Sequence, residues 1–208
     1  MKPRRRAGLP GPRIIGLTGS IGMGKSTAAV ILRSWRLPVH DSDATVHRLL
    51  GKGGAAVALV GKAFPGSIKD GAVDRRTLGA AVFGKPEELR RLEAILHPLV
   101  RDSERRFLKR HIRSEAVVLD IPLLFETKAE RRCDEVWVVS APPAIQKQRV
   151  LRRPTMTPEK FQAILRQQTP DELKRRLGDR VIPTGLGKAV TIRALAAALR
   201  SGQNHRHA

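Results

Sequence analysis

Short apolar runs alternate with helix-compatible stretches along most of this chain. The runs that we interpret as strands cover residues 14–18, 37–40, 116–121, 135–139 and 180–182. The third and fourth are continuously apolar rather than alternating, which is typical of strands covered on both faces. Because helical stretches separate these strands, the pattern predicts an α/β fold with a parallel sheet flanked by helices.

A mainly helical pattern occupies the stretch from about Ala44 to Arg113, which glycine-rich breaks interrupt. Apolar residues in its second half share helical spacing: Leu89, Leu92, Leu96, Leu99 and Val100. We therefore predict one domain over 13–200, with its core at 13–43 and 114–200 and a helical insertion at about 44–113. Basic, Pro/Gly-rich residues 1–12 and the final residues 201–208 are predicted to be tails.

A glycine-rich turn lies between the first predicted strand and a helix-compatible stretch at 26–35. It fits the pattern G-x-x-x-x-G-K-[ST] through Gly19, Ser20, Ile21, Gly22, Met23, Gly24, Lys25 and Ser26. Backbone amides of such a loop wrap a phosphate, and the positive end of the next helix adds to the attraction. We predict that the loop binds a nucleotide, that Lys25 reaches the β- and γ-phosphates, and that Ser26 offers its hydroxyl to Mg²⁺. ATPases, GTPases and small-molecule kinases share this loop, so it does not name the reaction.

Two carboxylates, Asp41 and Asp43, follow the second predicted strand, at the edge where open α/β sheets bind ligands. One aspartate beside an acceptor hydroxyl is enough base for phosphoryl transfer, which depends mainly on positioning and charge stabilisation. The same pair also suits an acidic cap for the helix near Ala44. Asp120 ends another strand, where a metal-associated aspartate and a turn residue before Pro122 fit equally well.

Histidine and arginine give less specific signals. His97 precedes Pro98 on a predicted helix, where a histidine is more often structural than catalytic. Arginines 149, 152 and 153 lie on a basic helical stretch at 142–168 that prolines interrupt. Such a charge run is usually a solvated face, but in a small kinase it also suits a lid that supplies arginines to the triphosphate.

Composition narrows the classes of function. A net charge of +21 attracts nucleic acid and phosphorylated metabolites alike, but 3% aromatics and no tyrosine leave few platforms for stacking single strands. A single cysteine, Cys133, excludes an internal disulfide and a multi-cysteine metal site. No apolar run approaches the roughly 18 residues of a membrane span, and the basic start lacks the apolar core of a signal peptide. We therefore expect a cytoplasmic location.

Four segments, taken in order, resemble the motif series of the dephospho-CoA kinase family. They are Thr18–Thr27, Asp41–Asp43, Leu92–Pro98 and Pro122–Glu126. The resemblance covers about residues 13–200, nearly the whole chain. The phosphate loop is widespread, whereas the His-Pro and Pro-Leu-Leu-Phe-Glu segments at these separations are much more specific to the family.

The resemblance implies transfer of the γ-phosphate of ATP to the 3′-hydroxyl of dephospho-CoA, the last step of coenzyme A synthesis. It implies a phosphate-loop kinase fold with a helical substrate-binding insertion and a lid at about 146–157. Asp43 would be the general base, and Asp41 would position substrate or metal-bound water. Further residues implied are Arg48, His97, Pro98 and Glu126 for the acceptor, Gln146, Arg149 and Arg153 in the lid, and Thr27 beside the nucleotide.

Two segments depart from the family pattern. Ser42 replaces the usual alanine between the two aspartates, which leaves both carboxylates in place, and Val181–Gly185 differs from the usual sequence near the adenine. A kinase for another small acceptor and a nucleic-acid-binding protein with a nucleotide switch stay open as alternatives. The interpretation as a dephospho-CoA kinase requires ATP and Mg²⁺, with dephospho-CoA as substrate. It requires neither nucleic acid nor a membrane as partner. A monomer or a small homo-oligomer is expected.

Overall fold

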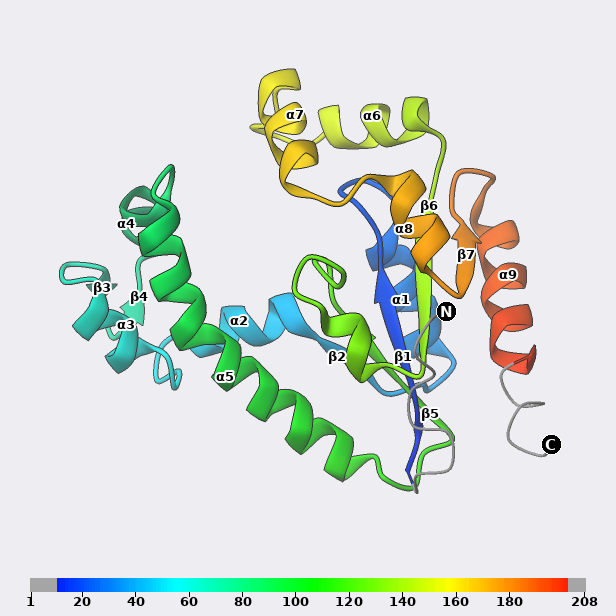
Figure 1. Ribbon diagram of the computed structural model, residues 1–208, viewed down its shortest axis with the longest axis horizontal. Coiled ribbons are helices and arrows are strands. Elements are labelled where there is room, and N and C mark those ends of the chain that lie inside the picture. Colours follow the sequence, from blue (N-terminus) through cyan, green and yellow to red (C-terminus); the bar gives the residue numbers. More distant parts are fainter. Residues whose placement is uncertain (1–10, 202–208) are drawn as a thin grey trace. The chain divides into compact units, whose positions relative to one another are not determined.

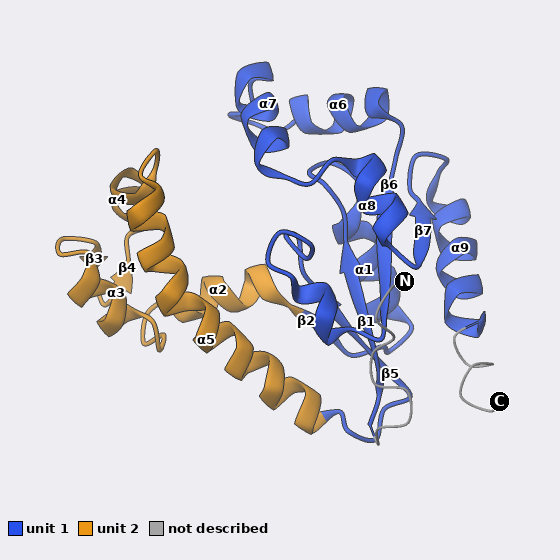
Figure 2. Cartoon of the chain, viewed as in Figure 1, with its two compact units in different colours: residues 1–40, 111–208 blue, residues 41–110 orange. Residues whose placement is uncertain are grey.

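The structure, a computed structural model, describes residues 11–201 (Figure 1). Most of both predicted tails therefore lies outside the described residues. Contacts divide the chain into two compact units, one formed by residues up to 40 together with those from 111 onward, and one formed by residues 41–110 (Figure 2). No helix within residues 11–201 combines the length and apolar character needed to cross a membrane.

The first unit is built on a five-stranded sheet with the order β2-β5-β1-β6-β7. Its strands are β1 (Arg13–Thr18), β2 (Val39–Asp41), β5 (Ala116–Asp120), β6 (Glu135–Ser140) and β7 (Arg180–Pro183). The pairs β1–β5, β1–β6 and β6–β7 are parallel. The predicted parallel α/β sheet is confirmed, and each predicted strand lies within two residues of an observed one.

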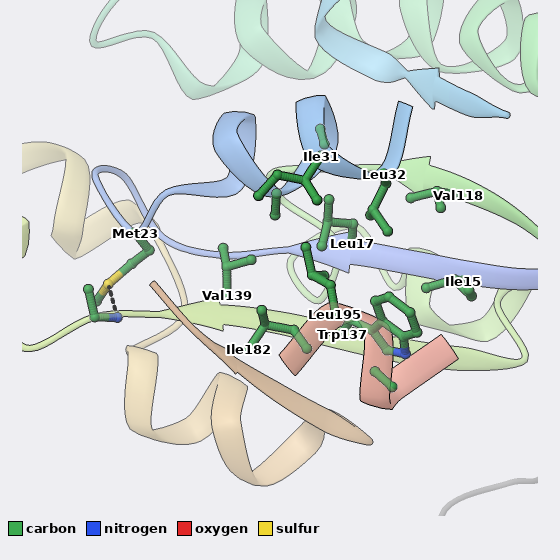
Figure 3. Close-up of a cluster of buried hydrophobic side chains, with 14 residues drawn as sticks. Ile15, Leu17, Met23, Ile31, Leu32, Val118, Trp137, Val139, Ile182 and Leu195 are labelled. Atoms are coloured by element: carbon green, nitrogen blue, oxygen red, sulfur yellow. Dashed lines mark hydrogen bonds between the residues drawn. The ribbon is translucent and has the colours of Figure 1, made fainter. Parts of the chain in front are cut away.

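One face of this sheet packs against two helices, α1 (Lys25–Ser34) and α9 (Lys188–Ser201). Alternate residues of the strands point to this face, because side chains of a strand alternate between the two sides of a sheet. The core that they form with the helices contains Ile15, Leu17, Ile31, Leu32, Val118, Trp137, Val139, Ile182 and Leu195 (Figure 3). Each of these side chains is at most 3% exposed. The cluster therefore holds the strands in place, and with them the loops that follow the strand ends.

The opposite face of the sheet is also covered, which explains the continuous apolar runs. Among the intervening strand residues, Val117, Leu119 and Val138 are completely buried. At Gly16 the covering segment comes very close, since a Cβ added there would lie 2.7 Å from both Cys133 Sγ and Leu124 Cδ1. Glycine in the central strand therefore permits this contact, and Cys133 is 1% exposed.

The basic stretch after β6 forms two helices, α6 (Pro143–Leu151) and α7 (Pro158–Gln167), with the predicted break between them. A proline stands in the first turn of each, where its missing N–H costs nothing. The short helix η1 (Ala129–Arg132) and helix α8 (Asp171–Leu177) were not predicted. Helix α8 contacts β6, so it belongs to the covering of the sheet.

The second unit contains α2 (Ser42–Leu50), α3 (Val57–Ala63), α4 (Arg75–Val82) and α5 (Pro86–Arg110). The long helix α5 contacts the other three, around a core of Leu50, Ala56, Val60, Phe64, Val73, Leu78 and Leu92. A small antiparallel hairpin of β3 (Ile68–Lys69) and β4 (Ala72–Val73) interrupts the helices and was not predicted. Asp70 and Gly71 turn this hairpin with φ of 51° and 78°.

Candidate active site

The glycine-rich loop joins the carboxyl end of β1 to the start of α1, as the sequence predicts. Gly22 and Gly24 have φ of 77° and 88°, in the left-handed region that favours glycine. A Cβ at Gly22 would also lie 2.5 Å from Val150 Cγ2 of α6. The loop thus folds tightly beneath α6, and a side chain at this glycine would push the two apart.

The loop is anchored in the core by Met23, whose side chain is 2% exposed. The backbone N–H of Ala141 donates to Met23 Sδ at 3.1 Å, the contact drawn as a dashed line in Figure 3. Ala141 directly follows β6, so this bond ties the loop to the end of the neighbouring strand. The middle of the loop is therefore fixed by packing as well as by its glycines.

Side chains from outside the loop hold two of its carbonyls. Gln146 Nε2 donates to the Ile21 carbonyl at 2.8 Å, and the Thr184 hydroxyl donates to the Met23 carbonyl at 2.6 Å. In a planar trans peptide the N–H points opposite to the carbonyl. The amides of Gly22 and Gly24, which share these two peptide planes, consequently point away from Gln146 and Thr184, as amides that receive an anion must.

Lys25 lies at the start of α1 and reaches back to the sheet. Its Nζ lies 2.5 Å from Oδ1 of Asp120, the last residue of β5, whose side chain is 4% exposed. Ser26 and Thr27 follow in the first turn and are exposed. Within residues 11–201 no cluster of three or more His, Cys, Asp or Glu side chains forms a ready-made metal site. The predicted metal role of Asp120 stays a prediction.

Arg149 of α6 lies beside the loop. Its Nη2 donates to the Thr184 carbonyl at 2.6 Å, and its Nη1 lies 3.4 Å from both the Gly22 carbonyl and the Thr184 hydroxyl oxygen. Arg153 follows the end of α6 and is exposed. The structure thus brings Arg149, Gln146 and the loop together, whereas Arg153 stands outside this set of contacts.

Beside the loop lies a cavity of about 330 Å³ within the first unit. Its lining comes from the loop, α6, α7 and the start of α8, through Ser20, Gln146, Leu165, Arg166, Thr169, Pro170 and Asp171. The space next to the phosphate loop is therefore bounded by Gln146, the first residue of the predicted lid, and by residues at 165–171, beyond that lid.

Glu126, predicted to line the acceptor site, makes its contacts within the first unit. Its Oε1 accepts from the backbone N–H of Thr169 at 2.7 Å and lies 3.1 Å from Lys174 Nζ, a side chain with no exposed surface. Burial acts to raise the pKa of Glu126. Hydrogen bonds from its own amide and from that of Thr169, together with the charge of Lys174, more than offset burial and hold the pKa below the usual glutamate range.

The lowered pKa of Glu126 predicts a contribution to stability at acid pH. Since the folded-state pKa lies below the unfolded one, this contribution is complete above about pH 4.3, the ordinary glutamate pKa, and is lost as the pH falls through the folded value. Urea unfolding at a series of pH values should therefore show the gap between wild type and Glu126→Gln narrowing below that pH. A gap that stays constant down to pH 3 would contradict the assignment.

Asp41, the last residue of β2, and Asp43 belong to the second unit and differ in their surroundings. Asp41 is the N-cap of α2, because its Oδ1 accepts from the backbone N–H of Ala44 at 2.9 Å. The capping interpretation is thus confirmed for Asp41. Asp43 lies in the first turn of α2 with an exposed side chain.

The other acceptor-side candidates also lie in the second unit. Arg48, on α2, donates through Nη2 to the Thr45 hydroxyl at 2.9 Å and is otherwise exposed. His97 and Pro98 are exposed residues inside α5. Their predicted contact with an acceptor stays a prediction.

Sequence reasoning missed three residues of the first unit that support the loop. Thr184 and Gln168 contact the loop itself, and Lys174 neutralises Glu126. Thr184 lies in Val181–Gly185, a segment that departs from the family pattern. This departure is the one signal in the sequence that the region differs from the corresponding region of the family. Lys174 lies in a run of basic residues, and the sequence of that run does not show which of its side chains is buried.

Comparisons with known proteins agree with this geometry. A dephospho-CoA kinase family model matches residues 13–186. A dephospho-CoA kinase of Paramagnetospirillum magneticum is 62% identical over 165 residues, 78% of each chain, and one of Rhodospirillum rubrum is 57% identical over 91% of this chain and 92% of the relative. The solved structure of the Thermus thermophilus protein TT1252 has a TM-score of 0.84 and 37% identity, covering 92% of this chain and 98% of that one. A Campylobacter jejuni dephospho-CoA kinase shares the fold, with a TM-score of 0.62 at 23% identity over 91% of this chain and 97% of that one. With its phosphate loop and a family match over most of its length, the chain belongs to the dephospho-CoA kinase family.

Proposed function

We propose that this kinase transfers the γ-phosphoryl group of ATP to the 3′-hydroxyl of dephospho-CoA, giving coenzyme A and ADP. The observation that carries the proposal is the phosphate loop, in a chain that matches the family from 13 to 186. The Ile21 and Met23 carbonyls of this loop are held from outside, so that the Gly22 and Gly24 amides point away from those supports. In this reaction the acceptor oxygen forms a bond to the γ-phosphorus while the bond from that phosphorus to the β–γ bridging oxygen breaks.

The first unit supplies the nucleotide side. Loop amides and Lys25 hold the phosphates, and the Lys25–Asp120 contact of 2.5 Å keeps the ammonium near the loop before it moves to the triphosphate. Arg149 has further N–H donors besides those on Thr184 and Gly22, so it can also reach the phosphates.

Mg²⁺ fits this site as an ion carried by the nucleotide. The described residues offer the Ser26 hydroxyl at the start of α1 and the Asp120 carboxylate, rather than a cluster of acidic ligands. Ser26 would hold the ion directly, and Asp120 is a further candidate. When bound, the ion neutralises charge that develops between the β- and γ-phosphates.

The second unit supplies the acceptor side. Asp43 takes the proton of the attacking hydroxyl, a role that its exposed carboxylate supports, whereas the Asp41 carboxylate is already engaged in capping α2. Arg48, His97 and Pro98 contribute to binding dephospho-CoA. Glu126 was expected to do so as well, and its contacts with Thr169 and Lys174 favour a supporting role in the first unit instead.

Purified protein given ATP, Mg²⁺ and dephospho-CoA should form coenzyme A and ADP in equal amounts, measured by chromatography and a coupled ADP assay. Lys25→Ala is the control, because it removes the phosphate-binding ammonium. Shikimate, gluconate and a nucleoside are tested in parallel. Product from one of these acceptors alone, or none above the control, would overturn the proposal, as would salt-sensitive DNA binding without any turnover.

A further inference from the structure

Both peptide groups of Ile21, in the middle of the phosphate loop, are held by glutamines. Gln168 Oε1 accepts from the Ile21 N–H at 3.0 Å, and Gln146 Nε2 donates to the Ile21 carbonyl at 2.8 Å. A backbone N–H needs an acceptor and a carbonyl needs a donor, so these partners settle which amide atom of each glutamine faces the loop. The two bonds therefore have opposite polarity.

The glutamines come from distant parts of the chain. Gln146 lies on α6, with 6% of its surface exposed, and Gln168 follows the last residue of α7. They are 125 and 147 residues from Ile21 in sequence. Because one bond fixes the peptide before the Ile21 Cα and the other fixes the peptide after it, together they restrain both φ and ψ of this residue.

The position of Gln168 is itself supported. The next residue, Thr169, donates its backbone N–H to Glu126, which is paired with the buried Lys174 of α8. This ion pair therefore fixes the chain immediately beside Gln168. A continuous series of contacts thus runs from Lys174 of α8, which packs on the sheet, through Glu126 and the chain at 168–169 to the phosphate loop.

We propose that Gln146 and Gln168 are positioning residues that set the conformation of the phosphate loop before nucleotide arrives, an inference that rests on the proposed binding of ATP by this loop. Fixing the Ile21 carbonyl outward aims the Gly22 amide in the opposite direction, toward the side on which the phosphates bind. A loop arranged in advance loses less conformational freedom when it binds, and so binds more tightly.

The test replaces each glutamine with methionine, which keeps the length of the side chain but removes the amide. Each variant should bind a fluorescent ATP analogue with Mg²⁺ about 3- to 10-fold more weakly, the usual loss for one hydrogen bond. The chain offers matched controls in its exposed neighbours, Gln148→Met on α6 and Gln167→Met on α7, which should bind as wild type does. Unchanged affinity in both Gln146→Met and Gln168→Met would overturn the proposal.

A second measurement separates positioning from general support of the fold. Without nucleotide, the amides of Ile21 and Met23, which donate to Gln168 Oε1 and to the Ser20 carbonyl, should exchange with solvent faster in the methionine variants, while those of α9 should not change. A role confined to stability would instead lower the melting temperature and leave affinity and local exchange of the folded protein as they are. That result would also overturn the proposal.

Glutamate substitutions test the polarity of the two bonds. Gln168→Glu still offers an acceptor to the Ile21 N–H, whereas Gln146→Glu sets a carboxylate against the Ile21 carbonyl. Both add one negative charge beside the same residue, so repulsion of the phosphates is similar in the two. Nucleotide should bind several-fold more weakly to Gln146→Glu than to Gln168→Glu, and equal affinities would contradict the assignment.

These binding measurements need no acceptor, so they fail independently of the proposed function. If wild type phosphorylates dephospho-CoA but the glutamine variants bind nucleotide normally, the positioning role is wrong and the function stands. If the variants lose affinity but wild type does not phosphorylate dephospho-CoA, the acceptor is wrong and the positioning role stands.

Discussion

Replacing Asp43 with asparagine is expected to lower turnover of dephospho-CoA by about 10²- to 10⁴-fold, the usual contribution of a positioned general base. Asparagine nearly preserves the shape of the side chain but cannot accept the hydroxyl proton. Affinity for MgATP should change little, because the nucleotide-binding loop belongs to the first unit. Turnover at saturating substrates and direct nucleotide binding are the two measurements.

Asp41→Asn is the matched control for this variant, since it removes the same charge two residues earlier. Asparagine caps a helix about as well as aspartate, so the bond to the Ala44 amide and the start of α2 should survive. Turnover should fall much less than in Asp43→Asn. If the two variants lose turnover equally, or if Asp43→Asn loses ATP affinity as much as turnover, Asp43 is not the base.

Replacing Glu126 with glutamine is expected to lower the free energy of unfolding at neutral pH by about 3–5 kcal/mol, the usual cost of leaving a buried charge without its partner. Lys174, with no exposed surface, would keep its ammonium beside a neutral amide. Urea unfolding of the purified variant measures the change. The effect should be accompanied by weaker nucleotide binding, because Glu126 fixes the chain next to Gln168.

Two further variants show whether the loss comes from the orphaned charge. Glu172→Gln breaks the Glu172–Arg176 pair on α8, the helix that carries Lys174, and both side chains of this pair are 74% exposed. The free energy of unfolding should fall little in this variant, because water screens such pairs. The double variant Glu126→Gln/Lys174→Met removes both buried charges and should recover part of the lost stability. If Glu126→Gln costs no more than Glu172→Gln, the buried pair does not stabilise the fold.

Much of the first unit could be predicted from the sequence because its signals are local. Continuous apolar runs mark β5 and β6, and the fixed spacing of glycines with Lys25 marks the turn between β1 and α1. Helix α8 escaped prediction, since its seven residues are mostly charged and show too few turns for a periodic pattern. The hairpin of β3 and β4 is shorter still, although the Asp70-Gly71 pair at its turn is a recognised signal.

The supports of the candidate site could not be predicted, because they depend on contacts between distant segments. The Thr184 hydroxyl meets the Met23 carbonyl across 161 residues, and Gln168 meets Ile21 across 147. A glutamine or a threonine in a polar segment carries no local mark of such a partner. Asp41 shows the complementary case, since an aspartate before a helix predicts a cap, and the structure contains that cap.

The close contact at Gly16 also makes the chain's single thiol a reporter of its motions. Cys133 Sγ lies against the central strand, so an alkylating reagent reaches it only when that strand separates from the segment that covers it. The labelling rate under native conditions therefore measures how often the middle of the sheet opens. Because β1 leads directly into the phosphate loop, ligands that bind the loop should slow this labelling. The rate then reports how much of the loop is occupied by ligand, with the native thiol as the reporter group.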